Sequence, residues 1–149
     1  MTAKSFKRLK TWHIGLWMLQ ILLAGMFLMV GFMKATTPIE ELSKVVPLAA
    51  EIPLLIRFIG FSELAAGLGL LLPAALRILP QLTVLAAAAL ALIMVLAILF
   101  HLMRGEYSSI GINIVLGTMA GLVAWGRLYQ APIASRSQVT VPLQRHKNE

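Results

Sequence analysis

The chain has 149 residues, of which 59% are hydrophobic and only 13% are charged, and its mean hydropathy is +0.86. A soluble domain has about half apolar and about a quarter charged residues, so this composition excludes an ordinary soluble protein. The absence of cysteine excludes disulfides, thiol redox chemistry and thiolate metal sites. The net charge of +7 does not indicate nucleic acid, because the basic residues flank apolar segments and do not alternate with exposed aromatic residues.

Four apolar segments are long enough to cross a bilayer, whose hydrocarbon core of about 30 Å needs about 20 helical residues. These segments are residues 12–33, 54–72, 82–103 and 110–127. They predict an all-α integral membrane four-helix bundle over residues 12–128. A basic N-terminus of residues 1–11 precedes the bundle, and a polar tail of residues 129–149, expected to be mobile, follows it.

The charges are distributed unequally between the two ends of these segments. One side receives nine basic residues, which are Lys4, Lys7, Arg8, Lys10, Arg77, Arg127, Arg136, Arg145 and Lys147. The other side mixes basic and acidic residues. By the positive-inside rule the first side is cytoplasmic, so both termini are predicted to be cytoplasmic. The same side carries the residues of an expected aromatic belt, Trp12, Trp17, Trp125 and Tyr129.

Local structure is also predicted in the connections around the second segment. Thr37 offers an N-cap, Pro38 suits the first helical position and Glu40 supplies a capping-box acid. A short helix at the outer membrane interface, ending by Pro47, follows from these residues and from the apolar stripe of Ile39, Leu42, Val45 and Val46. The segment of residues 73–80, which begins and ends with proline, predicts a tight turn.

Glu63 lies in the middle of the second segment, where an acid costs insertion roughly 2 to 3.5 kcal/mol or more. It is therefore expected to face the bundle, on a helical stripe shared with Ile56, Gly60, Gly67 and Leu70. Two interpretations stay open: a protonated or hydrogen-bonded acid that fixes helix packing, or a ligand-binding or proton-linked group. If desolvation keeps Glu63 protonated or hydrogen-bonded, Glu63→Gln is expected to preserve folding, and this is the expected outcome. If Glu63 instead forms an ion pair with Lys34 or Arg104, the same change is expected to be costly.

Gln20 and Lys34 lie on one stripe of the first segment, because steps of three and four residues return to the same helix face. Gln20 is at mid-depth and is the expected hydrogen-bond partner of Glu63. Lys34 ends the stripe at the outer boundary, where a lysine commonly snorkels to lipid headgroups. Snorkelling is the favoured interpretation of Lys34, with a site role as the alternative.

Three further polar residues fall near the outer ends of the third and fourth segments. His101 and Arg104 share a helix face, with Glu106 just beyond them. His101 fits either a ligand or proton relay, or a histidine satisfied by the loop. Asn113 begins a stripe of small residues and is interpreted as a packing contact before a binding group.

Five polar residues lie in the half of the bundle away from the cytoplasm, and Glu63 lies nearer the middle of the membrane. This distribution predicts an outward-facing polar pocket. The five residues are Lys34, Arg57, His101, Arg104 and Asn113. Neither a nucleophile with a neighbouring base nor a phosphate loop nor paired carboxylates appear, so an enzyme is not favoured. No clustered ligands indicate a metal site, and His13 and His146 are placed too far from His101 to share a haem with it.

Three motifs resemble those of DoxX-like four-helix membrane proteins. They are residues 31–34 (GFMK), residues 59–73 (IGFSELAAGLGLLLP) and residues 101–106 (HLMRGE). The resemblance covers roughly residues 12–127. It implies a bacterial inner-membrane protein of mostly undefined role, with Lys34, Glu63, His101 and Arg104 at the family's polar motif positions. Some relatives are subunits of a thiosulfate:quinone oxidoreductase, but thiol-linked roles do not fit a chain without cysteine.

The favoured function is therefore that of a noncatalytic membrane protein. It is expected to bind a lipid-like or small ligand in the outer pocket, or a partner membrane protein or a second copy of itself. The alternatives are a quinone-linked redox subunit, with His101 and Glu63 near a quinone carbonyl, and a proton-coupled transporter that works as an oligomer.

Overall fold

The computed structural model describes residues 3–136, and the tail beyond Arg136, including His146, lies outside the described residues. Within that range the chain is helical, with no strand. In chain order the helices are α1 (Ala3–Thr36), α2 (Ile39–Val45), α3 (Leu48–Glu51), α4 (Pro53–Leu76), α5 (Gln81–Arg104), the 3₁₀ turn η1 (Tyr107–Ser109), α6 (Ile110–Trp125) and the π-helical turn η2 (Gly126–Gln130). Four spans of 24 or more residues are long and apolar enough to cross a membrane: in α1, in α4, in α5, and from η1 through α6 to η2. The prediction of an all-α membrane protein with four spanning helices is confirmed.

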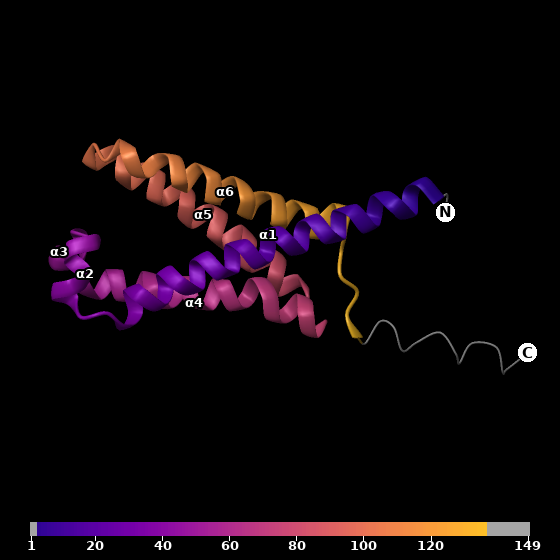
Figure 1. Ribbon diagram of the computed structural model, residues 1–149, viewed down its shortest axis with the longest axis horizontal. Coiled ribbons are helices and arrows are strands. Elements are labelled where there is room, and N and C mark those ends of the chain that lie inside the picture. The colour runs from indigo at the N-terminus through magenta and orange to yellow at the C-terminus, as the bar shows by residue number, and fades with distance from the viewer. Residues whose placement is uncertain (1–2, 137–149) are drawn as a thin grey trace, which may run out of the picture.

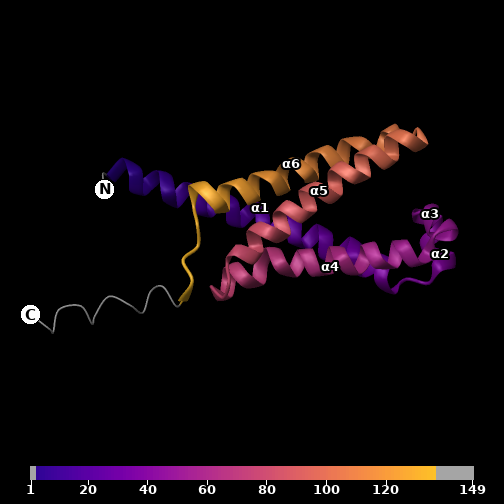
Figure 2. The same cartoon turned by 180° about the vertical axis from the view of Figure 1, so that it is seen from behind.

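The helices form two contacting pairs, α1 with α4 and α5 with α6, as Figure 1 shows. α4 and α5 diverge from the turn that joins them, and Figure 2 shows the same arrangement from behind. We call the end that carries α2, α3 and η1 the loop end, and the end that carries the α4–α5 turn and η2 the tail end. Between them lies a core to which all four long helices contribute: Leu23, Ala24, Phe27, Leu70, Ala87, Leu90, Met94, Ala120 and Val123.

α1 and α4 approach each other closely because glycines face each other at their contact. A Cβ added to Gly60 would lie 2.8 Å from the Cβ of Lys34 and 2.9 Å from the amide nitrogen of Ala35. One added to Gly31 would lie 2.8 Å from the carbonyl oxygen of Gly60. Small residues allow such contact between helix backbones in lipid, where packing replaces the hydrophobic effect as the main attraction. The predicted stripes of α1 and α4 are confirmed as the buried faces of these helices.

The connection between α1 and α4 contains the predicted helix and a second short one. α2 begins at Ile39, but Pro38 occupies the cap position and makes no side-chain cap bond, so the predicted capping by Thr37 is wrong. α2 ends at Val45, and α3 follows after Pro47. Both pack on the start of α4 through a small cluster of Leu42, Ala49 and Ile56. Their position at a membrane interface stays a prediction.

The α4–α5 connection is shorter than predicted. α4 continues through Pro73 to Leu76, and the reversal takes only residues 77–80. A proline near the end of a membrane helix removes a single backbone donor, which neighbouring structure tolerates. The reversal is made by Arg77 (φ 56°) and Leu79 (φ 47°), both in the left-handed region.

Candidate functional site

Lys34 and Glu63 form an ion pair between α1 and α4 in the loop half of the bundle. Lys34 Nζ lies 2.7 Å from Glu63 Oε1, and the two side chains are only 17% and 5% exposed. The close contact at Gly31 and Gly60 places these side chains one turn apart on facing helices. Lys34 therefore turns inward, and its interpretation as a snorkelling residue is wrong. The pair favours the ion-pair alternative over a neutral Glu63.

The second carboxyl oxygen of Glu63 is buried and has no hydrogen-bond partner among the described residues. The same holds for the amide nitrogen Nδ2 of Asn113, on the buried face of α6. Both atoms lie in the loop half of the bundle, and one is an acceptor whereas the other is a donor. A buried polar atom without a partner costs roughly 1 to 3 kcal/mol, so a native structure that keeps two of them calls for an explanation.

Arg57 of α4 binds the C-terminal end of α1 and the loop that follows it, beside this ion pair. Its guanidinium donates to the carbonyl oxygen of Lys34 at 2.6 Å and to the carbonyl oxygen of Thr37. These bonds satisfy carbonyl groups at the C-terminal end of α1 that the helix itself leaves open. Arg57 thus contacts the connection after α1 and makes no hydrogen bond to Glu63 among the described residues.

A second cluster of charged side chains lies at the loop end of α5. Glu106 accepts from Arg104 Nε at 2.7 Å, and its other oxygen lies 2.8 Å from His101 Nδ1. Arg104 also reaches Glu51 of α3 at 3.4 Å, so the group links α5 to the loop. The hydrogen bond from Arg104, followed by the one from His101, holds the pKa of Glu106 below its usual value. His101 and Arg104 thus share a face as predicted, and their partners are acids of the loop end.

Gln20 belongs to a different site from the one predicted. Its Nε2 donates to the carbonyl oxygen of Leu70 at 2.6 Å, and its Oε1 accepts from Arg127 Nε at 2.6 Å. The predicted bond to Glu63 is wrong, because Gln20 faces α4 about two turns closer to the tail end than Glu63 does. Gln20 and Arg127 are both buried, and together they form the centre of a polar group at the tail end.

Arg127 is packed from several sides in this group. Its Nη1 lies 3.1 Å from His13 Nδ1 and 3.4 Å from the carbonyl oxygen of Ala131. Because a guanidinium only donates, His13 accepts through Nδ1. The guanidinium carbon also lies 5.2 Å from the centre of the Trp17 ring, a cation–π contact.

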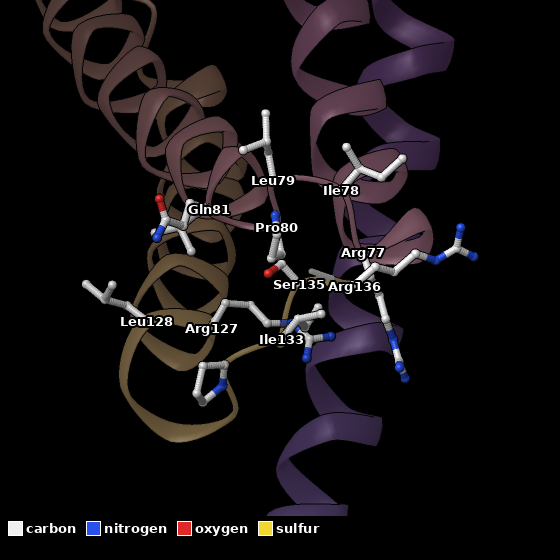
Figure 3. Close-up of a pocket in the computed structure, with 12 residues that line it drawn as sticks. Arg77, Ile78, Leu79, Pro80, Gln81, Arg127, Leu128, Ile133, Ser135 and Arg136 are labelled. Carbon is white, nitrogen blue, oxygen red and sulfur yellow. The ribbon is translucent and has the colours of Figure 1, made fainter. Parts of the chain in front are cut away.

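A cavity of about 620 Å³ opens beside Arg127 at the tail end, and Figure 3 shows its walls. The α4–α5 turn forms one wall, the end of the α6 segment forms the next, and the chain of residues 132–136 forms the third. The backbone N–H of Arg136 donates to the carbonyl oxygen of Arg77 at 3.1 Å, which holds that last segment in place.

The sequence interpretation missed the tail-end site, although a signal for it exists. The charge pattern places Arg127 in the basic flank of the fourth segment. Arg127 nevertheless continues the small-residue stripe that Asn113 begins on α6, since the steps are four, three, four and three residues. His13 likewise extends the stripe of Gln20 by one step of three and one of four. Continuing both stripes to the segment ends would have turned these residues inward.

The family model described as the DoxX-like family matches residues 18–123, which fall within the predicted bundle. The match includes Lys34, Glu63, His101 and Asn113, and it ends before Arg127. No curated protein and no solved structure matches the chain.

Proposed function

The chain belongs to the DoxX-like family, and we propose that it is a noncatalytic membrane protein that binds a lipid-like or small ligand in the loop half of its bundle. The observation that carries this proposal is that two buried polar atoms of the loop half, Glu63 Oε2 on α4 and Asn113 Nδ2 on α6, have no hydrogen-bond partner within the described residues. A ligand that donates to Glu63 Oε2, or one that accepts from Asn113 Nδ2, would remove the cost of that atom.

The two atoms define the chemistry of the ligand. A ligand at Glu63 presents a hydroxyl or amide donor, and a ligand at Asn113 presents a carbonyl or ether oxygen. The rest of the ligand is apolar, because both helices are apolar. Lys34 holds the other oxygen of Glu63, which fixes the carboxylate as a binding group. Arg57 and the Arg104–Glu106 group keep the loop end assembled above the site.

The alternative functions gain less support from the same contacts. A quinone-linked redox subunit needs His101 and Glu63 to donate to one quinone carbonyl, but a carboxylate paired with Lys34 only accepts hydrogen bonds. A proton-coupled transporter needs Glu63 to be free to pass a proton on, but one of its oxygens is held by Lys34 at 2.7 Å. We further propose a bacterial inner-membrane location with both termini cytoplasmic, supported by the excess of basic residues at the tail end.

The experiment is to compare the parent with Asn113→Leu by native mass spectrometry and by extraction of bound molecules. Removing an unpaired buried amide strands no partner, so Asn113→Leu should melt at or above the temperature of the parent. The fraction of protein that retains a bound molecule should nevertheless fall. The ultraviolet spectrum of the extract identifies a quinone if one is present.

Thr118→Val is the matched control, because Thr118 is exposed on the same helix and its hydroxyl bonds to the carbonyl of Ile114 at 2.8 Å. This variant should retain the ligand. If Asn113→Leu keeps the same bound molecules as the parent, the ligand does not contact Asn113. If it melts lower and no molecule is bound in either protein, Asn113 is a packing residue and the proposal fails.

A further inference from the structure

Arg127 is a buried cation that no acid of the described chain neutralises. The residue is 3% exposed, and its Nη2 is buried without a hydrogen-bond partner within residues 3–136. Its other contacts, Gln20, His13 and the Ala131 carbonyl, are all neutral acceptors. Hydrogen bonds to neutral groups do not replace a counter-charge for a cation removed from water.

The acidic residues of the described chain lie elsewhere. Glu40, Glu41 and Glu51 belong to the loop, Glu63 pairs with Lys34, and Glu106 pairs with Arg104. The cavity beside Arg127 is instead lined by two more arginines, Arg77 and Arg136, and by no acid among the residues that the structure describes. Figure 3 shows the Arg127 side chain beside Ile133, with the guanidinium groups of Arg77 and Arg136 extending away from it.

The surroundings hold the Arg127 guanidinium in one orientation. Gln20 accepts from Nε and is itself fixed by its bond to the Leu70 carbonyl. The π-helical turn η2 brings the residue against α1, because a Cβ at the preceding Gly126 would lie only 2.6 Å from the side chain of Leu16. Single π-turns of this kind are frequent at functional sites.

We propose that this cavity binds a phosphate group, presented as the headgroup of an anionic membrane lipid. A fixed guanidinium with a free N–H edge suits phosphate oxygens, which it binds through paired, charge-assisted hydrogen bonds. The remaining lining is largely apolar and includes Ile78, Leu79, Val84, Leu128 and Ile133, which suits the start of acyl chains. The cavity lies where α4 and the α6 segment end, the level at which a spanning helix meets headgroups. This site is separate from the one proposed in the loop half.

The test uses the full chain purified in neutral detergent. Melting temperature and native mass spectra are recorded with phosphatidylglycerol, with phosphatidylcholine of the same acyl chains, and with inorganic phosphate. Phosphatidylglycerol should raise the melting temperature of the parent, and phosphatidylcholine should raise it less. Arg127→Gln should weaken phosphatidylglycerol binding about tenfold or more, equivalent to ~1.4 kcal/mol.

Two further variants keep the result interpretable. Arg77→Asn removes an exposed guanidinium of the cavity at a left-handed position that asparagine tolerates, so it should fold and also weaken binding. Lys44→Gln removes an exposed basic residue of α2 at the loop end, and it should bind like the parent. If inorganic phosphate reproduces the effect, the anion is free phosphate and the site stands. If both lipids act equally on the parent, or if Arg127→Gln and Arg77→Asn retain full binding, the proposal is overturned.

Discussion

The two ends of the bundle treat a buried cation in opposite ways. At the loop half, Lys34 meets Glu63 at 2.7 Å, and glycines on both helices bring the two backbones close enough for that contact. At the tail end, Arg127 is more deeply buried than Lys34, yet it meets only neutral acceptors and an aromatic ring. Among the described residues, the loop half supplies its own counter-charge and the tail end does not.

This difference separates a structural ion pair from a binding group. A paired buried charge contributes little net stability, but it strongly penalises the loss of either partner. A buried charge without a partner inside the protein is costly unless a ligand or lipid supplies the opposite charge. An acid lies beside Lys34, whereas no acid of the described residues lies beside Arg127. The Arg127 site is therefore the one that can bind an anion.

The largest expected effect is on the stability of the loop half, where Lys34 and Glu63 pair. Glu63→Gln should strand the Lys34 ammonium and lower the free energy of unfolding by about 3 to 5 kcal/mol. Adding Lys34→Gln to it should recover part of the loss, because the stranded charge is removed as well. The unfolding free energies of the parent, Glu63→Gln, Lys34→Gln and the double variant, measured in detergent, give the coupling energy of the pair. Additive single losses, with no recovery, would show that the two side chains do not pair.

A smaller effect is expected from adding a methyl group at each end. Gly60→Ala places a Cβ against backbone atoms of α1 that cannot move aside, at a cost of about 1 to 3 kcal/mol. Gly126→Ala meets only the flexible side chain of Leu16 and should cost less. Gly111→Ala, with open space around its Cβ, is the control and should melt like the parent or above it. Equal losses for Gly60→Ala and Gly111→Ala would contradict the close helix contact.

The smallest effect is on the pH dependence of stability and concerns Glu106, in the exposed cluster of charged side chains at the loop end of α5. Because the pKa of Glu106 is held below its usual value, the folded protein binds that proton less readily than the unfolded chain does. The stabilisation is fully present above the ordinary glutamate pKa of about 4.3 and is lost as the pH falls below it. Comparing the melting temperature of the parent and Glu106→Gln between pH 7 and pH 4 measures this. A gap that widens as the pH falls would contradict the sign.

Much of the fold follows from the sequence because lipid imposes simple rules. A span needs about 20 apolar residues, and an intramembrane acid must face the bundle, which places Glu63 and its glycines on the buried face of α4. The continuation of α4 through Pro73 could not be predicted, since a proline marks a break in water but is tolerated near the end of a membrane helix.

The partners within the site were harder to predict than its faces. Helix periodicity gives the direction of Gln20 and Lys34, but not how far α1 slides along α4. A shift of about two turns decides whether Gln20 or Lys34 meets Glu63. That shift is set by the contact of Gly31 with Gly60, a relation between two helices that a single sequence does not state.

The contrast between the two ends is tested most directly by the unfolding free energies of Lys34→Met and Arg127→Met, measured side by side in neutral detergent free of anionic lipid and phosphate. Lys34→Met should lose about 3 to 5 kcal/mol, because it leaves the buried Glu63 carboxylate without its partner. Arg127→Met should lose clearly less, about 1 to 3 kcal/mol, because the loss of the donor to Gln20, His13 and the Ala131 carbonyl is offset by the removal of an unneutralised cation. If Arg127→Met costs as much as Lys34→Met under these conditions, the tail end is already balanced within the protein and the contrast is contradicted.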